Sequence, residues 1–175
     1  MSNRSRGLAS LLAVAVLVAG PAWAAQARAT EPRNDKEYVI KAIAVESAEV
    51  TLADLAAKNA SNDDVRKLAK TISEEHTKSR DALMAQAKNM KVGVVAGLTK
   101  DHQLKVAKMR LKKGNEFDRA YVQHVIDSHT SGETMYKNWS GSTKDAELKK
   151  LATKYETTAK DHLKKAKDLQ KKLGE

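Results

Sequence analysis

The 175-residue chain contains no cysteine, which excludes disulfide bonds, cysteine-ligated zinc or iron–sulfur centres and a thiol nucleophile. Proline is almost as scarce, because Pro21 and Pro32 are the only two and none follows Pro32. A long stretch without proline that is rich in alanine, lysine and leucine favours helices over strands. Apolar residues still make up 41% of the chain, which is enough to build the core of one domain at this length.

The first 24 residues have the three-part pattern of a secretory signal peptide. Arg4 and Arg6 give a positive start, an apolar run of about twelve residues follows at 8–19, and small residues precede a cleavage point after Ala24. The run is shorter than the roughly 20 residues that a membrane-spanning helix needs. We therefore expect a periplasmic or secreted protein, and a retained membrane anchor is the alternative.

The net charge of +10 does not by itself indicate a nucleic-acid partner. The leader carries two arginines and no acid, so residues 25–175 keep +8 of that charge. Residues 144–175 hold ten lysines and six acids, with helical pairs such as Asp161 and Lys165, but few aromatic residues. This mixture predicts a solvated helix face and no nucleic-acid binding. Weak contact with an anionic membrane surface or envelope polymers is the further expectation.

Capping residues and helical spacing predict five helices after a polar lead-in at residues 25–34. The predicted helices cover residues 35–59, 63–90, 100–113, 115–139 and 144–172. The expected N-caps are Asn34 or Asp35, Ser61 or Asn62, and Thr99. Gly114 is expected to end the short third helix, and residues 140–143 are expected to form a loop.

The lengths of these helices indicate the fold. Four long helices with a short connection inside each pair predict an all-α, four-helix bundle of two antiparallel hairpins, with an extra short connecting helix. The bundle is expected to span residues 35–173. A coiled coil is the alternative, and the lack of a strict heptad seam disfavours it.

Each long helix places one ionisable residue on its apolar face. Steps of about 100° per residue bring Glu49, His76, His129 and His162 inward, while Glu46 falls at the edge of the first face. A buried carboxylate is costly unless it is paired or bound to a metal. Carboxylate and imidazole ligands from several helices can hold a metal ion in a bundle core, here iron, zinc or copper.

A structural role for the same four residues is the alternative interpretation, in which they form buried hydrogen-bonded pairs that fix the register of the helices. The spacing of a di-iron site is missing, because Ser73 and Ala159 stand three residues before His76 and His162. Counting residues from the turns predicts a height difference of roughly 6 Å within the first hairpin and roughly 12 Å within the second. Two separate pairs are therefore expected rather than one compact site.

Other common chemistries are not indicated by the sequence. No glycine-rich phosphate loop and no nucleophile elbow is present, so we predict no catalytic residue and no nucleotide-type cofactor site. Binding is favoured over catalysis.

Several segments resemble a known family. The run from Phe117 to Val122, followed by Asp127-Ser128-His129, resembles the central motif of an exported bacterial family called domain of unknown function 4142. Further similar segments are residues 49–56, 61–69, 72–76 and 161–163. The resemblance implies a ferritin-like bundle in the periplasm or at the outer membrane. It also implies recurring Glu and His positions that match the four inward residues.

The family has no established biochemical role, so two hypotheses about function remain. The first is a non-enzymatic envelope protein that serves binding or stress tolerance. The second is a metal-binding bundle that uses Glu49, His76, His129 and His162.

Overall fold

The computed structural model describes residues 32–94 and 97–174, and this part of the chain is helical without any strand. The predicted leader, residues 1–24, lies outside the described residues. The helices are α2 (Asp35–Asn59), α3 (Asp63–Asn89), α4 (Lys100–Arg110), α5 (Gly114–Ser142) and α6 (Ala146–Gly174). None of these helices combines the length and the apolar character that crossing a membrane requires.

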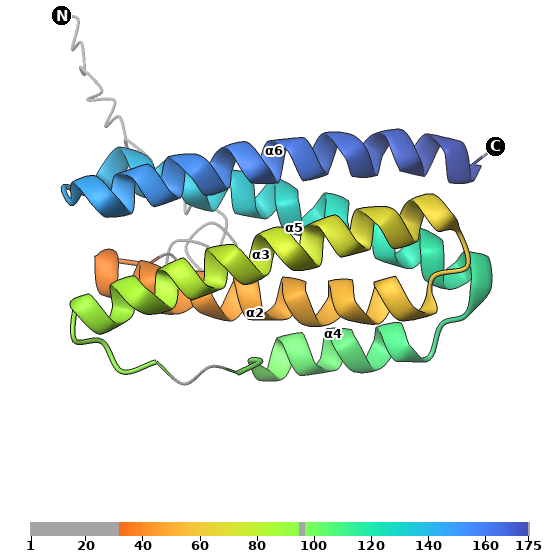
Figure 1. Ribbon diagram of the computed structural model, residues 1–175, viewed down its shortest axis with the longest axis horizontal. Coiled ribbons are helices and arrows are strands. Elements are labelled where there is room, and N and C mark those ends of the chain that lie inside the picture. Colours follow the sequence, from red (N-terminus) through yellow and green to blue (C-terminus); the bar gives the residue numbers. More distant parts are fainter. Residues whose placement is uncertain (1–31, 95–96, 175) are drawn as a thin grey trace, which may run out of the picture. The chain divides into compact units, whose positions relative to one another are not determined.

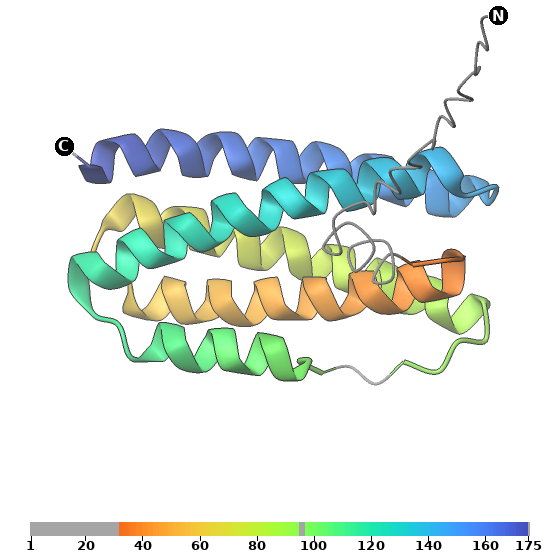
Figure 2. The ribbon, with the colours of Figure 1, turned by 180° about the vertical axis from the view of Figure 1, so that it is seen from behind.

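The four long helices form two antiparallel hairpins (Figure 1). Helix α2 packs along α3 and α5 packs along α6, while α2 also contacts α5 and α3 also contacts α6. Helix α4 lies outside this bundle, beside α2, and touches α5 as well (Figure 2). The predicted four-helix bundle with an extra short helix is therefore confirmed, whereas its ferritin-like classification stays a prediction.

Side-chain caps begin three of the helices where the sequence predicts them. The Asn34 side chain accepts a hydrogen bond from the backbone N–H of Glu37, at 3.1 Å. Asn62 caps α3 through the N–H of Asp64, and Thr99 caps α4 in the same way. Each cap satisfies N–H groups that have no partner inside the helix.

The ends of α4 and α5 differ from the prediction. Helix α4 ends at Arg110, and Gly114 begins α5 instead of ending α4. Gly114 has φ +53, a left-handed conformation that glycine adopts without a steric penalty. The predicted loop at 140–143 is helical through Ser142, because the buried Trp139 anchors this last turn in the core.

The core has two apolar clusters, one toward each end of the bundle. The first contains Leu52, Ile72, Phe117 and Val125, and the second contains Ile43, Leu83, Trp139 and Leu148. Between them every long helix contributes buried ionisable side chains. This polar belt consists of Glu46, Glu49, His76, His129 and His162.

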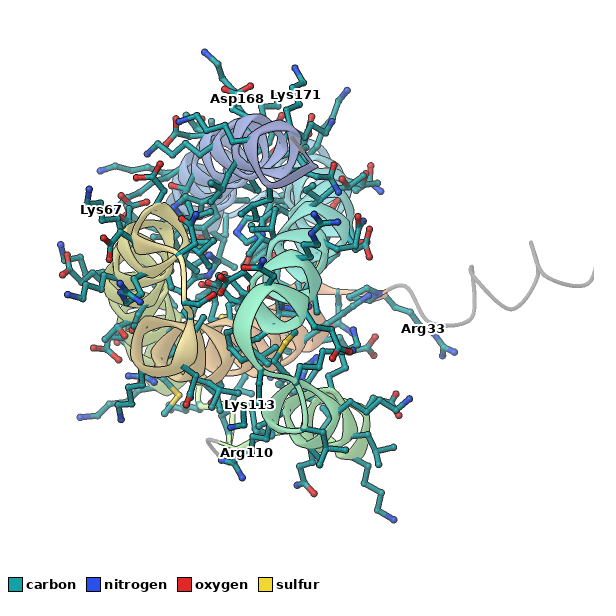
Figure 3. The ribbon with its side chains drawn as sticks, turned by 90° about the vertical axis from the view of Figure 1, so that its right-hand side faces the viewer. Arg33, Lys67, Arg110, Lys113, Asp168 and Lys171 are labelled. Carbon is teal, nitrogen blue, oxygen red and sulfur yellow. The ribbon has the colours of Figure 1, made fainter. Side chains whose placement is uncertain are left out.

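Apart from the polar belt and the buried Asp118, the described bundle directs its other charged side chains toward the surface. Seen along the bundle, Lys67, Asp168 and Lys171 point away from the packed centre (Figure 3). Charged side chains on the described surface are exposed and paired mainly within their own helix, as Asp161 and Lys165 are at 2.6 Å. Exposure to solvent therefore does not account for the ionisable residues of the polar belt, which are buried.

Candidate metal centre

Three of the four predicted residues meet at one point. His76 of α3, His129 of α5 and His162 of α6 each offer a ring nitrogen, and these nitrogens lie within 4.8 Å of one another. The Nε2 atom of His129 is 3.2 Å from Nε2 of His76 and 3.1 Å from Nδ1 of His162. All three side chains are buried, so the three-histidine cluster lies inside the bundle.

The expectation of two separate pairs is wrong for these histidines. It assumed a loop at 140–143 and therefore a height difference of roughly 12 Å between His129 and His162. Helix α5 continues through Ser142 and α6 begins only at Ala146. His129 lies about 13 residues from the turn and His162 about 16, which reduces the difference to roughly 4.5 Å. The two rings therefore meet across the hairpin.

The outward nitrogen of each ring lies close to an oxygen atom of the protein. Nδ1 of His76 lies 2.7 Å from Oε2 of Glu46, and Nδ1 of His129 lies 2.9 Å from the carbonyl oxygen of Val125. Nε2 of His162 lies 3.0 Å from Oε2 of Glu75, a charge pair without hydrogen-bond alignment. A neutral imidazole carries its proton on one nitrogen only. The hydrogen-bond acceptors beside His76 and His129 place a proton on each outward nitrogen, and the Glu75 carboxylate favours the same tautomer of His162, which leaves lone pairs directed inward.

Three lone pairs at this distance repel each other unless a cation lies between them. One shared proton can bridge only two of the nitrogens, because His129 Nε2 has a single lone pair for two neighbours. A metal ion can accept all three lone pairs. Histidines that hold metals carry an oxygen partner on the other ring nitrogen, as these rings do. The residues present thus fit a metal that prefers imidazole ligands, such as copper or zinc.

The protonation of two of the three rings favours metal binding. Burial lowers the pKa of His129 and of His162 to about 4, and neighbouring positive charge adds to the effect. Both rings are therefore neutral at pH 7, which is the form that binds metals. Burial also opposes protonation of His76, but the Glu46 carboxylate outweighs it and raises the pKa of His76.

Glu46 is a site residue that the sequence analysis did not include among its candidates, because it placed Glu46 only at the edge of the apolar face of the first helix. It is 1% exposed and accepts hydrogen bonds from His76 and from the hydroxyl of Tyr136. Burial and the Glu46 carboxylate both raise the pKa of Tyr136, so the hydroxyl keeps its proton. Glu46 and His76 each stand about 13 residues from the turn that joins their helices. The equal distance of Glu46 and His76 from this turn is the signal in the sequence that could have identified them as a pair.

Glu49 lies apart from the three-histidine cluster. Its Oε1 atom is 3.3 Å from Nε2 of His124, a residue of α5. Burial raises the pKa of Glu49, but His124 and the other histidines outweigh burial and hold it well below its usual range. The structure thus keeps Glu49 as a buried anion beside the cluster, and its predicted role as a metal ligand stays a prediction.

A small cavity lies beside Glu49 and two histidines of the cluster. Its volume is about 20 Å³, and its walls include Glu46, Glu49, His76, His129 and Tyr136. A cavity of this size has room for about one water molecule, and the carboxylates and rings among its lining residues offer that water polar partners. A metal ion held by three protein ligands would have a fourth position open to a small ligand, and the cavity borders two of the three histidines.

The fold and the cluster define a class of protein, an all-helical bundle with three imidazoles buried at its middle. The chain belongs to the family called Domain of unknown function (DUF4142), whose model matches residues 19–169. This confirms the resemblance drawn from the sequence motifs. No curated protein matches the chain.

Solved structures with the same fold share little sequence with this chain. A DUF305 fragment from Deinococcus radiodurans has a TM-score of 0.72 at 13% identity, over 81% of this chain and 98% of the fragment. CopM in the Cu(II)-bound form has a TM-score of 0.69 at 18% identity, over 79% of this chain and 96% of its own. CopM in the Ag-bound form has a TM-score of 0.66 with the same identity and coverage. At this identity the likeness establishes the fold alone.

Proposed function

We propose that the protein binds a copper ion at His76, His129 and His162 and serves to hold that ion rather than to catalyse a reaction. The observation that supports this most is the convergence of three ring nitrogens whose outward partners leave their lone pairs facing one another. Such an arrangement is unfavourable without a cation and favourable with one.

Copper is our choice among the metals that imidazole binds. Imidazole ligands suit copper, zinc, iron and nickel, and copper binds most tightly in the divalent series. CopM, which shares this fold, has been solved with Cu(II), with Cu(I) and with silver. Zinc is the second candidate, because three histidines with an open fourth position also form a typical zinc site.

The surrounding residues would orient the ligands. Glu46 and the Val125 carbonyl hold the rings of His76 and His129 by hydrogen bonds, and Glu75 lies against His162. The negative charge of Glu46 would partly balance the charge of the bound ion. These contacts exist in the chain without metal, so little reorganisation is needed when the ion binds.

The location that we propose is the cell envelope. The leader pattern at residues 1–24 and membership of the DUF4142 family support export, and a copper-binding protein without cysteine suits an oxidising compartment. Weak attraction of the lysine-rich α6 surface to anionic envelope polymers remains part of this proposal.

Metal content of the purified protein tests the proposal. The full chain is offered Cu(I) under anaerobic conditions, Cu(II), Zn(II) and Fe(II) in separate samples, and retained metal is measured by mass spectrometry. We expect about one copper ion per chain. Replacing a ligand should cost more than the ~10–100-fold in affinity that is typical for loss of an orienting contact. His129→Gln should therefore retain little copper.

His102→Gln is the matched control, because it removes a histidine that lies outside the cluster. This variant should keep the copper content of the parent protein. Retention of less than a tenth of an equivalent of every metal by the parent protein would overturn the proposal. That result would favour the alternative in which the histidines only fix the register of the helices.

A further inference from the structure

A second group of ionisable side chains lies between the three-histidine cluster and helix α4. Glu49 of α2 and His124 of α5 form a charge pair, with 3.3 Å between Oε1 and Nε2. His102 of α4 lies close enough to both for their charges to act on its pKa. Among the described residues these three do not form a three-ligand group, so they are not a second centre of the same kind.

Two ring nitrogens in this group are buried without a hydrogen-bond partner among the described residues. They are Nε2 of His124 and Nδ1 of His102. A buried polar atom without a hydrogen-bond partner is unfavourable and calls for an explanation. The nitrogen of His124 faces a carboxylate oxygen, an arrangement that suits a cation held between the two.

Glu49 also borders the cavity beside the cluster, whose walls include His76 and His129. On the other side of α2, a groove of about 730 Å³ runs between α2 and α4 and includes His102 among its walls. Val45 lines both the groove and the cavity. Ligand-type side chains therefore stand at both ends of this path, His102 at the groove and Glu49 at the cavity, and His124 pairs with Glu49.

We propose that Glu49 and His124 form an entry site, which takes a metal ion from the groove and passes it to His76, His129 and His162. This inference rests on the proposed function and assigns the route to that same centre. Two protein ligands hold an ion more weakly than three, so an ion at the entry site moves on to the cluster. A separation of 3.3 Å suits an ion about 2 Å from each ligand atom.

A route past Glu75 is the competing one, because the Glu75 side chain is 43% exposed and lies against His162. It faces the outward nitrogen of His162, however, whereas the lone pairs that receive the ion point inward. The cavity is bordered by Glu49 and not by Glu75. The groove carries charge of both signs, including Asp101 and Lys105, so Glu49 supplies the anionic charge that draws the ion inward.

Rates of metal binding and release test the entry site. Zn(II) and Cu(II) are mixed with the full-length chain in a stopped-flow instrument, and release is followed with an excess of chelator. Glu49→Gln and His124→Gln should each slow association at least tenfold. Release should slow by the same factor, because an ion leaves by the route through which it enters. The dissociation constant and the stoichiometry should therefore stay unchanged.

Glu133→Gln is the control, because it removes an acid of α5 one turn beyond His129 and outside this route. It should leave both rates unchanged. Unchanged rates in Glu49→Gln and His124→Gln would overturn the entry site, as would slowed association in Glu75→Gln alone. A higher dissociation constant in Glu49→Gln would make Glu49 a ligand of the centre and overturn the inference. Absence of metal from the parent protein would instead overturn the proposed function itself.

Discussion

Glu46 illustrates how one buried carboxylate is stabilised inside the bundle. Its two oxygens accept hydrogen bonds from His76 and Tyr136, so both partners of the buried charge come from other helices. Removing one partner of a buried charged pair costs about 3–5 kcal/mol, because the remaining group is left without compensation. The carboxylate therefore fixes the His76 ring in the orientation that the cluster needs.

Glu46→Gln should weaken copper binding while leaving the chain folded. The amide keeps the shape of the side chain but lacks the charge that orients His76 and raises its basicity. We expect the affinity to fall by about 10–100-fold. A competition titration with a coloured chelator measures it. Glu156→Gln, which alters a half-buried acid of α6 that pairs with Lys160 and is not part of the cluster, should bind copper as the parent does. Equal affinities in the two variants would show that Glu46 does not orient the ligand.

The sequence predicted the histidines of the centre better than its carboxylate. His76, His129 and His162 each lie at the middle of an apolar face, which helical periodicity detects. Periodicity also favoured Glu49 over Glu46, because it reports the direction of a side chain but not its height. Height has to be compared between helices. Glu46 and His76 stand at equal height above the correctly placed α2–α3 turn, whereas the misplaced end of α5 separated His129 from His162. The pairing across helices was therefore beyond a prediction made one helix at a time.

At the scale of elements, two aspartates join the hairpins at opposite ends of the bundle. Asp118 of α5 is fully buried and accepts hydrogen bonds from the backbone N–H groups of Ser61 and Asn62, and from the Ser61 hydroxyl. At the other end, Asp35 of α2 accepts from Trp139 Nε1, at 3.0 Å. Each aspartate thus ties an end of one hairpin to the other hairpin.

Asp118→Ala should destabilise the fold strongly. The substitution removes the acceptor of three hydrogen bonds, which come from two backbone N–H groups and one hydroxyl group in the α2–α3 turn. We expect a loss of about 3 kcal/mol in the free energy of unfolding. Urea denaturation measures the loss. Asp127→Ala on the exposed side of the same helix should change stability by no more than about 0.5 kcal/mol. Similar losses in both variants would contradict the assigned role of Asp118.

Helix positions could be predicted from local chemistry, and the ties between helices could not. The caps Asn34, Asn62 and Thr99 act within a few residues of the chain, so the sequence reveals them directly. The partners of Asp118 are more than fifty residues away, at Ser61 and Asn62. Such contacts depend on how the hairpins pack, which no local pattern contains.

At the scale of the whole molecule, the polar belt interrupts a core that is otherwise apolar. The two apolar clusters on either side of it stabilise the bundle, while the belt brings several ionisable groups into a region of low polarity. The molecule therefore gives up part of the stability that a continuous apolar core would provide. A ligand that neutralises the repulsion within the belt should restore some of it.

Copper should accordingly stabilise the fold. A ligand at 100 times its dissociation constant that binds only the folded state adds about 2.7 kcal/mol. For a chain of this size the melting temperature should rise by about 5–10 °C. Differential scanning calorimetry with and without the ion measures the shift. His129→Gln should show no comparable shift, and an equal shift in both proteins would place the ion elsewhere in the molecule.

The stability of the metal-free protein should fall as the pH drops from 7 to 5.5. His129 and His162 have a folded-state pKa of about 4, below their unfolded value of 6.5, so the unfolded chain binds more protons in this range. Stability contributed by such groups is present above pH 6.5 and is lost as the pH falls toward 4. His76 opposes the trend, because its raised pKa makes the folded state bind its proton more tightly. The two histidines with a lowered pKa outweigh the one with a raised pKa, so the free energy of unfolding should fall by about 2 kcal/mol.

Urea denaturation at several pH values between 7 and 5.5 measures this fall. Carboxylates with normal pKa values stay ionised in that window. In the double variant H129N/H162N only the opposing contribution of His76 should remain, so stability should no longer fall as the pH drops. An unchanged slope in that variant would mean that other groups titrate.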